Sequence, residues 1–129
     1  MTETAAFRKM NRDEYLRFMN DSVADYTETL IEGRAPDRET ARREAEKEFY
    51  GMFPDGLSAK DQFPAIIQDA QSGKAVGEIW FGYEEEDGVR QVFLSEFLIY
   101  REERGKGYAT AALAEMERIA KADGYAAAL

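Results

Sequence analysis

The amino-acid sequence predicts a mixed α/β fold whose elements follow the order β-α-α-β-β-β-α-β. Two segments before residue 52 and one after residue 105 carry apolar residues at the three- and four-residue steps of a helix. Three segments between residues 65 and 100 are rich in β-branched and aromatic residues and are separated by turn signals. The strand, helix and strand at the end of the chain favour a parallel pairing after a mostly antiparallel meander, with helices on both faces of a mixed sheet.

The first part of the chain is expected to contain a short strand and two helices. The strand is expected at residues 5–10, and Asn11 with Glu14 then forms the capping box of a helix that ends near Gly33. The apolar face of this helix comprises Tyr15, Leu16, Met19, Val23, Tyr26 and Leu30. A second helix starts at Pro36-Asp37, and its thin apolar face comprises Ala41, Ala45 and Phe49. The charges at residues 38–47 are expected to form its solvated face.

The rest of the chain is expected to hold a connector at residues 52–63, three strands, a helix and a last strand. The strands are expected at residues 65–67, 76–83 and 89–100, and Asp87-Gly88 predicts a hairpin between the second and third. The helix extends from Gly105 to Asp123, with Gly124 as its C-terminal cap, and has a stripe of Ala109, Ala112, Leu113, Met116, Ile119 and Ala120. The last strand begins at Tyr125.

Composition excludes several classes of catalytic site. The 129 residues include no Cys and no His, and 17 basic against 26 acidic residues give a net charge of −9. Disulfides, zinc sites built on Cys and His, and Ser-His or Cys-His catalysis are therefore excluded. Proton transfer must use Glu, Asp, Tyr, Lys, a water or the backbone. The acids at residues 84–87 are expected to form a solvated hairpin tip, and we expect no metal site.

The acidic balance also bears on partners and localisation. A field that repels polyanions disfavours nucleic acid and anionic membrane surfaces as partners. A cationic substrate fits the charge, although acidity is also an ordinary means of staying soluble. Residues 1–9 have no apolar core typical of a signal peptide, and no apolar run approaches the roughly 20 residues of a membrane span. We therefore expect a cytoplasmic protein.

The most informative segment joins the third of these strands to the helix that follows. Backbone N–H groups at a helix start have no intrahelical partner, and glycines let an anion approach them closely. Gly105 and Gly107 supply this property, and Arg104 and Lys106 add positive charge. The segment fits neither a Walker A loop nor a Rossmann fingerprint, which requires glycine where Thr110 stands. On these residues alone, an anion site and a plain helix start remain equal alternatives.

The residues Arg104-Gly105-Lys106-Gly107-Tyr108-Ala109 resemble the Arg/Gln-x-x-Gly-x-Gly/Ala signature of the GNAT superfamily of N-acetyltransferases. An apolar strand precedes this signature and an alanine-rich amphipathic helix follows it. Upstream, residues 53–57 and 77–82 also resemble a bacterial branch of this superfamily. The resemblance covers nearly the whole chain and implies a single GNAT-type domain over residues 1–129.

The resemblance implies acetyl-coenzyme A (acetyl-CoA) as co-substrate and assigns two groups of residues to it. The pyrophosphate would be bound by the signature loop, which comprises Arg104, Gly105, Lys106, Gly107, Tyr108, Ala109 and Thr110. The pantetheine arm would pair like an added strand with Phe97, Leu98, Ile99 and Tyr100, where the strand splays at a bulge. A strand N–H near Leu98 would polarise the thioester carbonyl.

The implied reaction is direct transfer of the acetyl group to a primary amine in a ternary complex, without a covalent enzyme intermediate. In the family a Glu commonly takes the proton of the amine, often through a water. Glu96 is the first candidate here and Glu78 the second, and burial would bring either carboxylate toward the required basicity. For each, a solvent-exposed or ion-paired carboxylate is the alternative. The rival function is a non-catalytic acyl-CoA-binding or protein-interaction module with a GNAT-like fold.

The sequence departs from the family pattern at its C-terminus. In the family the strand that begins here near Tyr125 is followed by a further helix, which supplies a Tyr general acid, and by closing strands. No residue of this chain maps to that acid. The chain would be either the N-terminal portion of a longer enzyme, weakly active or inactive alone, or a degenerate relative that binds without turnover. An incomplete sheet edge would also favour a homodimer.

Overall fold

A five-stranded sheet with one helix forms the larger of two units into which the chain divides. The structure is a computed structural model that describes residues 4–35, 37–54 and 56–127. Met1–Lys9 and Lys60–Leu129 form this first unit, here called the sheet unit, and Met10–Ala59 forms the second, the helical unit. The expected order of elements is confirmed. Pro36, Asp55 and Leu129, on which parts of the expectation depended, lie outside the described residues.

The sheet has the strand order β1-β2-β3-β4-β5. Its strands are β1 (Ala5–Lys9), β2 (Gln62–Asp69), β3 (Ala75–Glu86), β4 (Val89–Ile99) and β5 (Ala126–Ala127). The first four are antiparallel neighbours, and β5 is parallel to β4, as a strand-helix-strand connection requires. β2 begins earlier than expected, because Gln62 and Phe63 pair with β3 and are not part of a connector. The Gln62 side chain accepts a hydrogen bond from Nε1 of Trp80 at 2.7 Å, which holds this start of the strand.

The hairpin between β3 and β4 has a tight turn at its tip and an irregularity in pairing further along, nearer to the site. At its tip, Asp87 and Gly88 have φ values of 53° and 80°, the left-handed pair that a tight two-residue hairpin turn requires. Further along, Trp80 pairs with Glu96 whereas Phe81 pairs with Leu94. Ser95 is therefore an extra residue that forms a β-bulge in β4.

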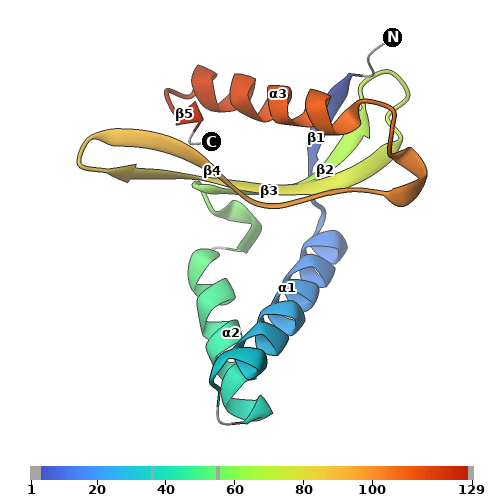
Figure 1. Ribbon diagram of the computed structural model, residues 1–129. Helices are drawn as coiled ribbons and strands as arrows, with labels where there is room; N and C mark the ends of the chain where they lie inside the picture. Colours follow the sequence, from blue (N-terminus) through green and yellow to red (C-terminus); the bar gives the residue numbers. More distant parts are fainter. Residues whose placement is uncertain (1–3, 36, 55, 128–129) are drawn as a thin grey trace. The chain divides into compact units, whose positions relative to one another are not determined.

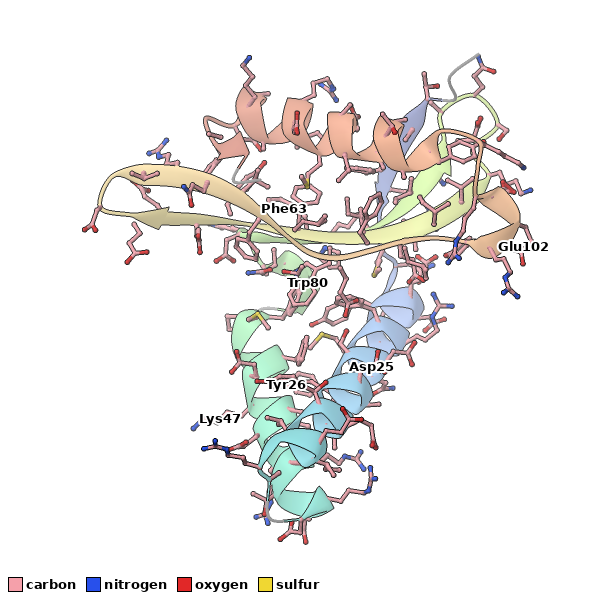
Figure 2. All side chains as sticks on the ribbon, viewed as in Figure 1. Asp25, Tyr26, Lys47, Phe63, Trp80 and Glu102 are labelled. Atoms are coloured by element: carbon pink, nitrogen blue, oxygen red, sulfur yellow. The ribbon has the colours of Figure 1, made fainter. Side chains whose placement is uncertain are left out.

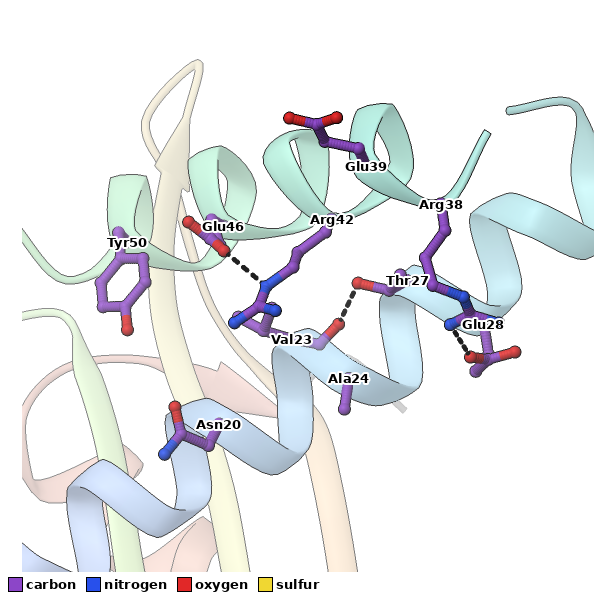
Figure 3. A pocket seen from close by; sticks show the side chains of 10 residues that line it. All are labelled: Asn20, Val23, Ala24, Thr27, Glu28, Arg38, Glu39, Arg42, Glu46 and Tyr50. Carbon is purple, nitrogen blue, oxygen red and sulfur yellow. Dashed lines mark hydrogen bonds and ion pairs between the residues drawn. The ribbon is translucent and has the colours of Figure 1, made fainter. Parts of the chain in front are cut away.

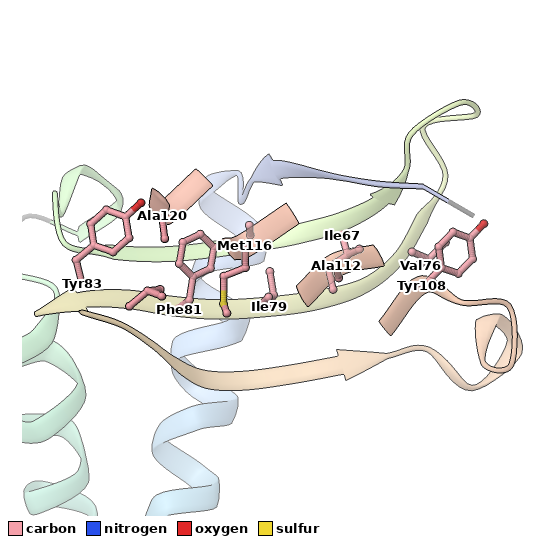
Figure 4. Packing of buried hydrophobic residues seen from close by; sticks show 11 residues of the cluster. Ile67, Val76, Ile79, Phe81, Tyr83, Tyr108, Ala112, Met116 and Ala120 are labelled. Atoms are coloured by element: carbon pink, nitrogen blue, oxygen red, sulfur yellow. The ribbon is translucent and has the colours of Figure 1, made fainter. Parts of the chain in front are cut away.

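Helix α3 (Tyr108–Ala122) packs on one face of the sheet and builds its core (Figure 1). Its buried stripe consists of Tyr108, Ala112, Met116 and Ala120. These side chains pack against buried residues of the strands: Ala65, Ile67, Val76, Ile79, Phe81, Tyr83 and Val92 (Figure 4). At the C-terminal end of α3, Tyr83 donates a hydrogen bond to Asp123 at 2.7 Å and stacks on Tyr125. Gly124 follows with a φ of 87°, as a helix-ending glycine does.

The helical unit consists of α1 (Arg12–Gly33), α2 (Arg38–Met52) and a short 3-10 helix, η1 (Gly56–Ser58). The capping box of Asn11 and Glu14 is present, and Asp37 caps α2. Aromatic edge contacts join the two helices, such as that of Tyr26 with Phe49. The expectation that Leu16 belongs to the buried face was wrong: its side chain is 45% exposed. One residue after Tyr15, it lies about 100° around the helix from that side chain, beside the buried stripe.

Candidate functional site

The connection from β4 to α3 leaves a helix N-terminus without a side-chain cap. After β4 the chain forms one 3-10 turn, η2 (Arg101–Glu103), and then Gly105 and Gly107 take φ values of 78° and 92°. Glycine has this left-handed region available without steric cost. Gly107 is the N-cap of α3 and has no side chain to bond the first N–H groups of the helix. Those N–H groups and the helix dipole together favour an anion.

A hollow of about 500 Å³ lies at this connection, within the range typical of ligand clefts. Nine of the eleven residues that the sequence assigned to the coenzyme line it, and Tyr100 and Lys106 do not. Glu103 lines it as well and was not predicted. The lining residues are Phe97, Leu98, Ile99, Glu103, Arg104, Gly105, Gly107, Tyr108, Ala109 and Thr110. The hollow therefore joins the end of β4 to the start of α3.

The main chain of β4 offers hydrogen-bonding groups on the edge away from β3. Among the described residues, β5 pairs with β4 only at Gln91 and Val92. Near the end of β4, the carbonyl oxygen of Leu98 points toward β3. It lies so close to Gly77 of β3 that a Cβ atom at that residue would clash with it. The backbone N–H and C=O groups of successive residues point to opposite edges of a strand. Those of Phe97 and Ile99 therefore face the outer edge of β4. Consistently, Nε of Arg104 donates to the Ile99 carbonyl at 2.9 Å.

The positive charge at the loop is partly balanced by a buried acid. Glu103 is 5% exposed, and its two carboxylate oxygens accept from Lys74 at 2.7 Å and from Lys106 at 3.3 Å. The Lys74 ammonium, with support from Lys106, holds the pKa of the Glu103 carboxyl below its usual range. Among the described residues, Arg104 has no carboxylate partner. Arg104, which lines the hollow, is therefore a cation whose charge is not paired within the part of the chain that is described.

A second buried acid holds the first residue of α3. Tyr108 is 6% exposed, and its hydroxyl donates to Oδ2 of Asp69 at 2.7 Å. Oδ1 of Asp69 accepts from the N–H groups of Gln71 and Ser72. These bonds, that of Ser72 first, hold the pKa of the Asp69 carboxyl well below its usual range. The sequence missed Asp69, Lys74 and Glu103, whose partners are distant along the chain.

The two candidate bases lie on one face of the sheet, opposite to α3. Glu96 pairs with Trp80 and Glu78 pairs with Leu98, so the two carboxylates are diagonal neighbours on adjacent strands. Figure 2 shows Phe63 and Trp80 on opposite faces of the sheet, with Trp80 on the face that Glu96 shares. Glu96 is exposed and Glu78 is partly buried. The register thus brings both candidates together, while their role in proton transfer stays a prediction.

A larger hollow, of about 920 Å³, lies between the helices of the helical unit (Figure 3). Two ion pairs lie along this hollow. Arg38 of α2 pairs with Glu28 of α1, and Arg42 pairs with Glu46 within α2. None of the residues predicted for the site lines it.

Within the described ranges there is no group of three or more acidic residues arranged to hold a metal ion. No helix of the described part is both long and apolar enough to cross a membrane.

Comparison with known proteins relates this arrangement to one family. Residues 16–129 match the model of the acetyltransferase (GNAT) family. The chain is 25% identical over 121 residues to the uncharacterised N-acetyltransferase YycN of Bacillus subtilis, a match that covers 94% of this chain and 77% of that protein. The crystal structure of YycN superposes with a TM-score of 0.74 at 24% identity, covering 98% of this chain and 82% of that one.

A second solved structure shows the same fold at lower identity. It is that of a predicted acetyltransferase from Clostridium acetobutylicum, solved with acetyl-CoA. It superposes with a TM-score of 0.58 at 16% identity, covering 98% of this chain and 80% of that one.

Proposed function

Because the chain belongs to the acetyltransferase (GNAT) family, we propose that it is an N-acetyltransferase domain with acetyl-CoA as co-substrate and a primary amine as acceptor. The observation that carries this proposal is the uncapped start of α3, where Gly107 has a φ of 92° and no side-chain cap. It lies beside a hollow that reaches back along the end of β4.

The residues present fit the coenzyme in charge and in shape. A pyrophosphate needs closely spaced N–H donors and positive charge. The start of α3 provides the donors, and Arg104 lines the same hollow. At Gly105 an added Cβ would meet nothing within 4 Å, so the space beside the loop is open. The outer-edge groups of Phe97 and Ile99 would pair with the amides of the pantetheine arm as a neighbouring strand does.

We propose direct transfer as the reaction. Acetyl-CoA supplies an acetyl thioester. The amine nitrogen would form a bond to its carbonyl carbon, the bond from that carbon to sulfur would break, and coenzyme A would leave as the thiolate. Glu96 takes the proton of the amine, through a water, and Glu78 is the second candidate. An outward N–H of β4 at Phe97 or Ile99 polarises the carbonyl oxygen in place of the Leu98 N–H. The sequence offers no Cys or His for a covalent route.

Calorimetric titration with acetyl-CoA tests the binding site. Arg104→Glu reverses the charge at the mouth of the hollow and is expected to raise Kd at least about tenfold, or about 1.4 kcal/mol. Arg43→Glu is the matched control, because it makes the same change in net charge on an exposed face of α2. Equal affinities of Arg104→Glu and the unaltered protein would remove the site assignment. Binding without turnover on a panel of primary amines would favour the non-catalytic module.

The pH dependence of turnover tests the base. Glu96→Gln keeps the shape of the side chain and removes its ability to accept a proton. We expect a large loss of kcat, loss of the acidic limb of the pH profile and an unchanged Kd for acetyl-CoA. Glu78→Gln is measured in parallel. If only Glu78→Gln has these effects, Glu78 is the base and the assignment of Glu96 is wrong.

A further inference from the structure

We propose that the turn between β2 and β3, residues 69–74, positions the coenzyme-binding loop. In this inference Asp69 and Lys74 are positioning residues that act through Tyr108 and Glu103. It rests on the proposed function, because the loop that they hold is the one assigned to acetyl-CoA.

The turn is itself well defined by hydrogen bonds. The Asp69 N–H donates to the carbonyl of Lys74 at 2.8 Å, and the Gly73 N–H donates to the carbonyl of Asp69 at 2.9 Å. The Asp69 carboxylate accepts from two further N–H groups inside the turn, and Ser72 Oγ accepts from the Lys74 N–H. These internal hydrogen bonds restrict the conformation of the turn, so side chains that contact the turn are held in defined positions.

Two side-chain bonds connect this turn to the loop, one at each end of its glycine segment. On one side, Lys74 donates to Glu103, the residue just before Arg104. On the other, Tyr108, the residue just after Gly107, donates to Asp69. Both acceptor carboxylates are buried, Glu103 at 5% and Asp69 at 8% exposure. Residues 104–107 are thereby fixed at both ends by a single turn distant in sequence.

The reason for such fixation lies in the two glycines. Glycine loses more conformational freedom on ordering than any other residue, so a free Gly-x-Gly segment would lower the affinity for its ligand. Fixing both ends restricts this segment before the ligand arrives. The N–H groups of the loop and of α3 can then converge on an anion at a smaller entropic cost.

The chain contains a matched control for this device. Tyr83 donates to Asp123 at 2.7 Å, the same length as the bond of Tyr108 to Asp69. Both phenols are buried and both bonds join α3 or its end to the strands. The Tyr83 bond, however, is at the C-terminal end of α3, and Tyr83 does not line the hollow between the end of β4 and the start of α3.

The experiment compares Tyr108→Phe, Lys74→Met and Tyr83→Phe in the full chain. Calorimetry gives Kd for acetyl-CoA, thermal denaturation gives Tm, and hydrogen exchange reports on the amides of residues 105–107 without ligand. We expect Tyr108→Phe and Lys74→Met each to raise Kd about fivefold and to speed exchange of these amides. Tyr83→Phe should lower Tm comparably and leave both quantities unchanged. In turnover, KM for acetyl-CoA should rise while KM for the amine does not.

Each outcome decides between explanations. Tyr108→Phe changes no charge, so its effect on Kd cannot come from lost attraction of the anion. Unchanged Kd and exchange in both loop variants would overturn the inference, and so would an equal rise of Kd in Tyr83→Phe, which would indicate a general effect of stability. If the unaltered protein does not bind acetyl-CoA, the proposed function fails and the inference fails with it. If the unaltered protein binds acetyl-CoA and Tyr108→Phe and Lys74→Met bind it equally tightly, the proposed function stands without the inference.

Discussion

Helices α1 and α3 begin in opposite ways. At the start of α1, Oδ1 of Asn11 accepts from the Glu14 N–H at 2.8 Å, and Oε1 of Glu14 accepts from the Asn11 N–H at 2.9 Å. At the start of α3, Gly107 offers no acceptor, and no acidic residue is present in the first turn. A capped helix start uses its own side chains for the groups that a ligand would need. The absence of a cap at the start of α3 supports the proposal that an anion binds there, because its first N–H groups are not used by side chains of the helix itself.

The charges near the two starts differ in the same sense. Asp13 and Glu14 are in the first turn of α1, where negative charge stabilises the helix dipole. The loop before α3 instead presents Arg104, which has no carboxylate partner among the described residues. Substitutions that give the N-terminus of α3 an acidic residue, or remove the cap from α1, therefore test whether the uncapped start of α3 serves ligand binding.

The largest effect is expected when the start of α3 is given the acid that α1 has. Thr110 is the third residue of α3, as Glu14 is of α1, and its side chain is exposed. Thr110→Glu should raise Kd for acetyl-CoA at least about tenfold, or about 1.4 kcal/mol, because the carboxylate repels the pyrophosphate. It should leave Tm unchanged or raise it, since the acid favours the helix dipole.

Calorimetry and thermal denaturation of the same samples measure both quantities. Ala114→Glu, also exposed on α3 but one turn further along, is the control of equal charge. If Thr110→Glu binds acetyl-CoA as tightly as Ala114→Glu does, the open start of α3 is not the anion site.

An intermediate effect is expected when α1 is made to resemble α3. Asn11→Ala removes the acceptor of the capping box and should lower the free energy of unfolding by about 1 kcal/mol. Affinity for acetyl-CoA should not change, because this start has no proposed part in binding. Chemical denaturation measures the loss, with Asn20→Ala, an exposed change in the middle of the same helix, as the control. A loss of coenzyme affinity in Asn11→Ala would contradict the division between the two helices.

The smallest effect concerns the pH dependence of the cap on α2. The Thr40 N–H donates to Asp37 at 2.7 Å and holds the pKa of this carboxyl below its ordinary value of 3.8. Because the folded state has the lower pKa, the charged cap stabilises the protein fully above that value and loses its contribution as pH falls below it. Asp37→Asn keeps the cap but removes the titration. The difference in Tm between the two proteins should therefore change below about pH 4 and stay constant above pH 5.

Local signals in the sequence identified most of the fold and the core of the candidate site. The capping box at Asn11, the hairpin at Asp87-Gly88 and the glycine segment before α3 depend on neighbouring residues, and the structure has all three. The supports of the loop depend on distant partners: Tyr108 is 39 residues from Asp69, and Glu103 is 29 from Lys74. No periodicity or motif predicts such pairs. The predicted burial of Leu16 was wrong for a different reason. Whether a side chain at the margin of a helical stripe is buried depends on which residues pack against it, and the helical pattern alone does not contain this information.

The bulge at Ser95 has a consequence for how β4 can be exchanged between proteins. Before it, even-numbered Val92 and Leu94 pack on the core beneath α3, and after it odd-numbered Phe97 and Ile99 do so. The strand thus changes parity in the middle. A grafted strand of equal length but regular pairing would turn Phe97 and Ile99 outward and send Glu96 toward the core. In chimaeras or loop swaps, residues 94–108 should therefore be moved as one cassette, with the inserted residue and the glycines that follow it.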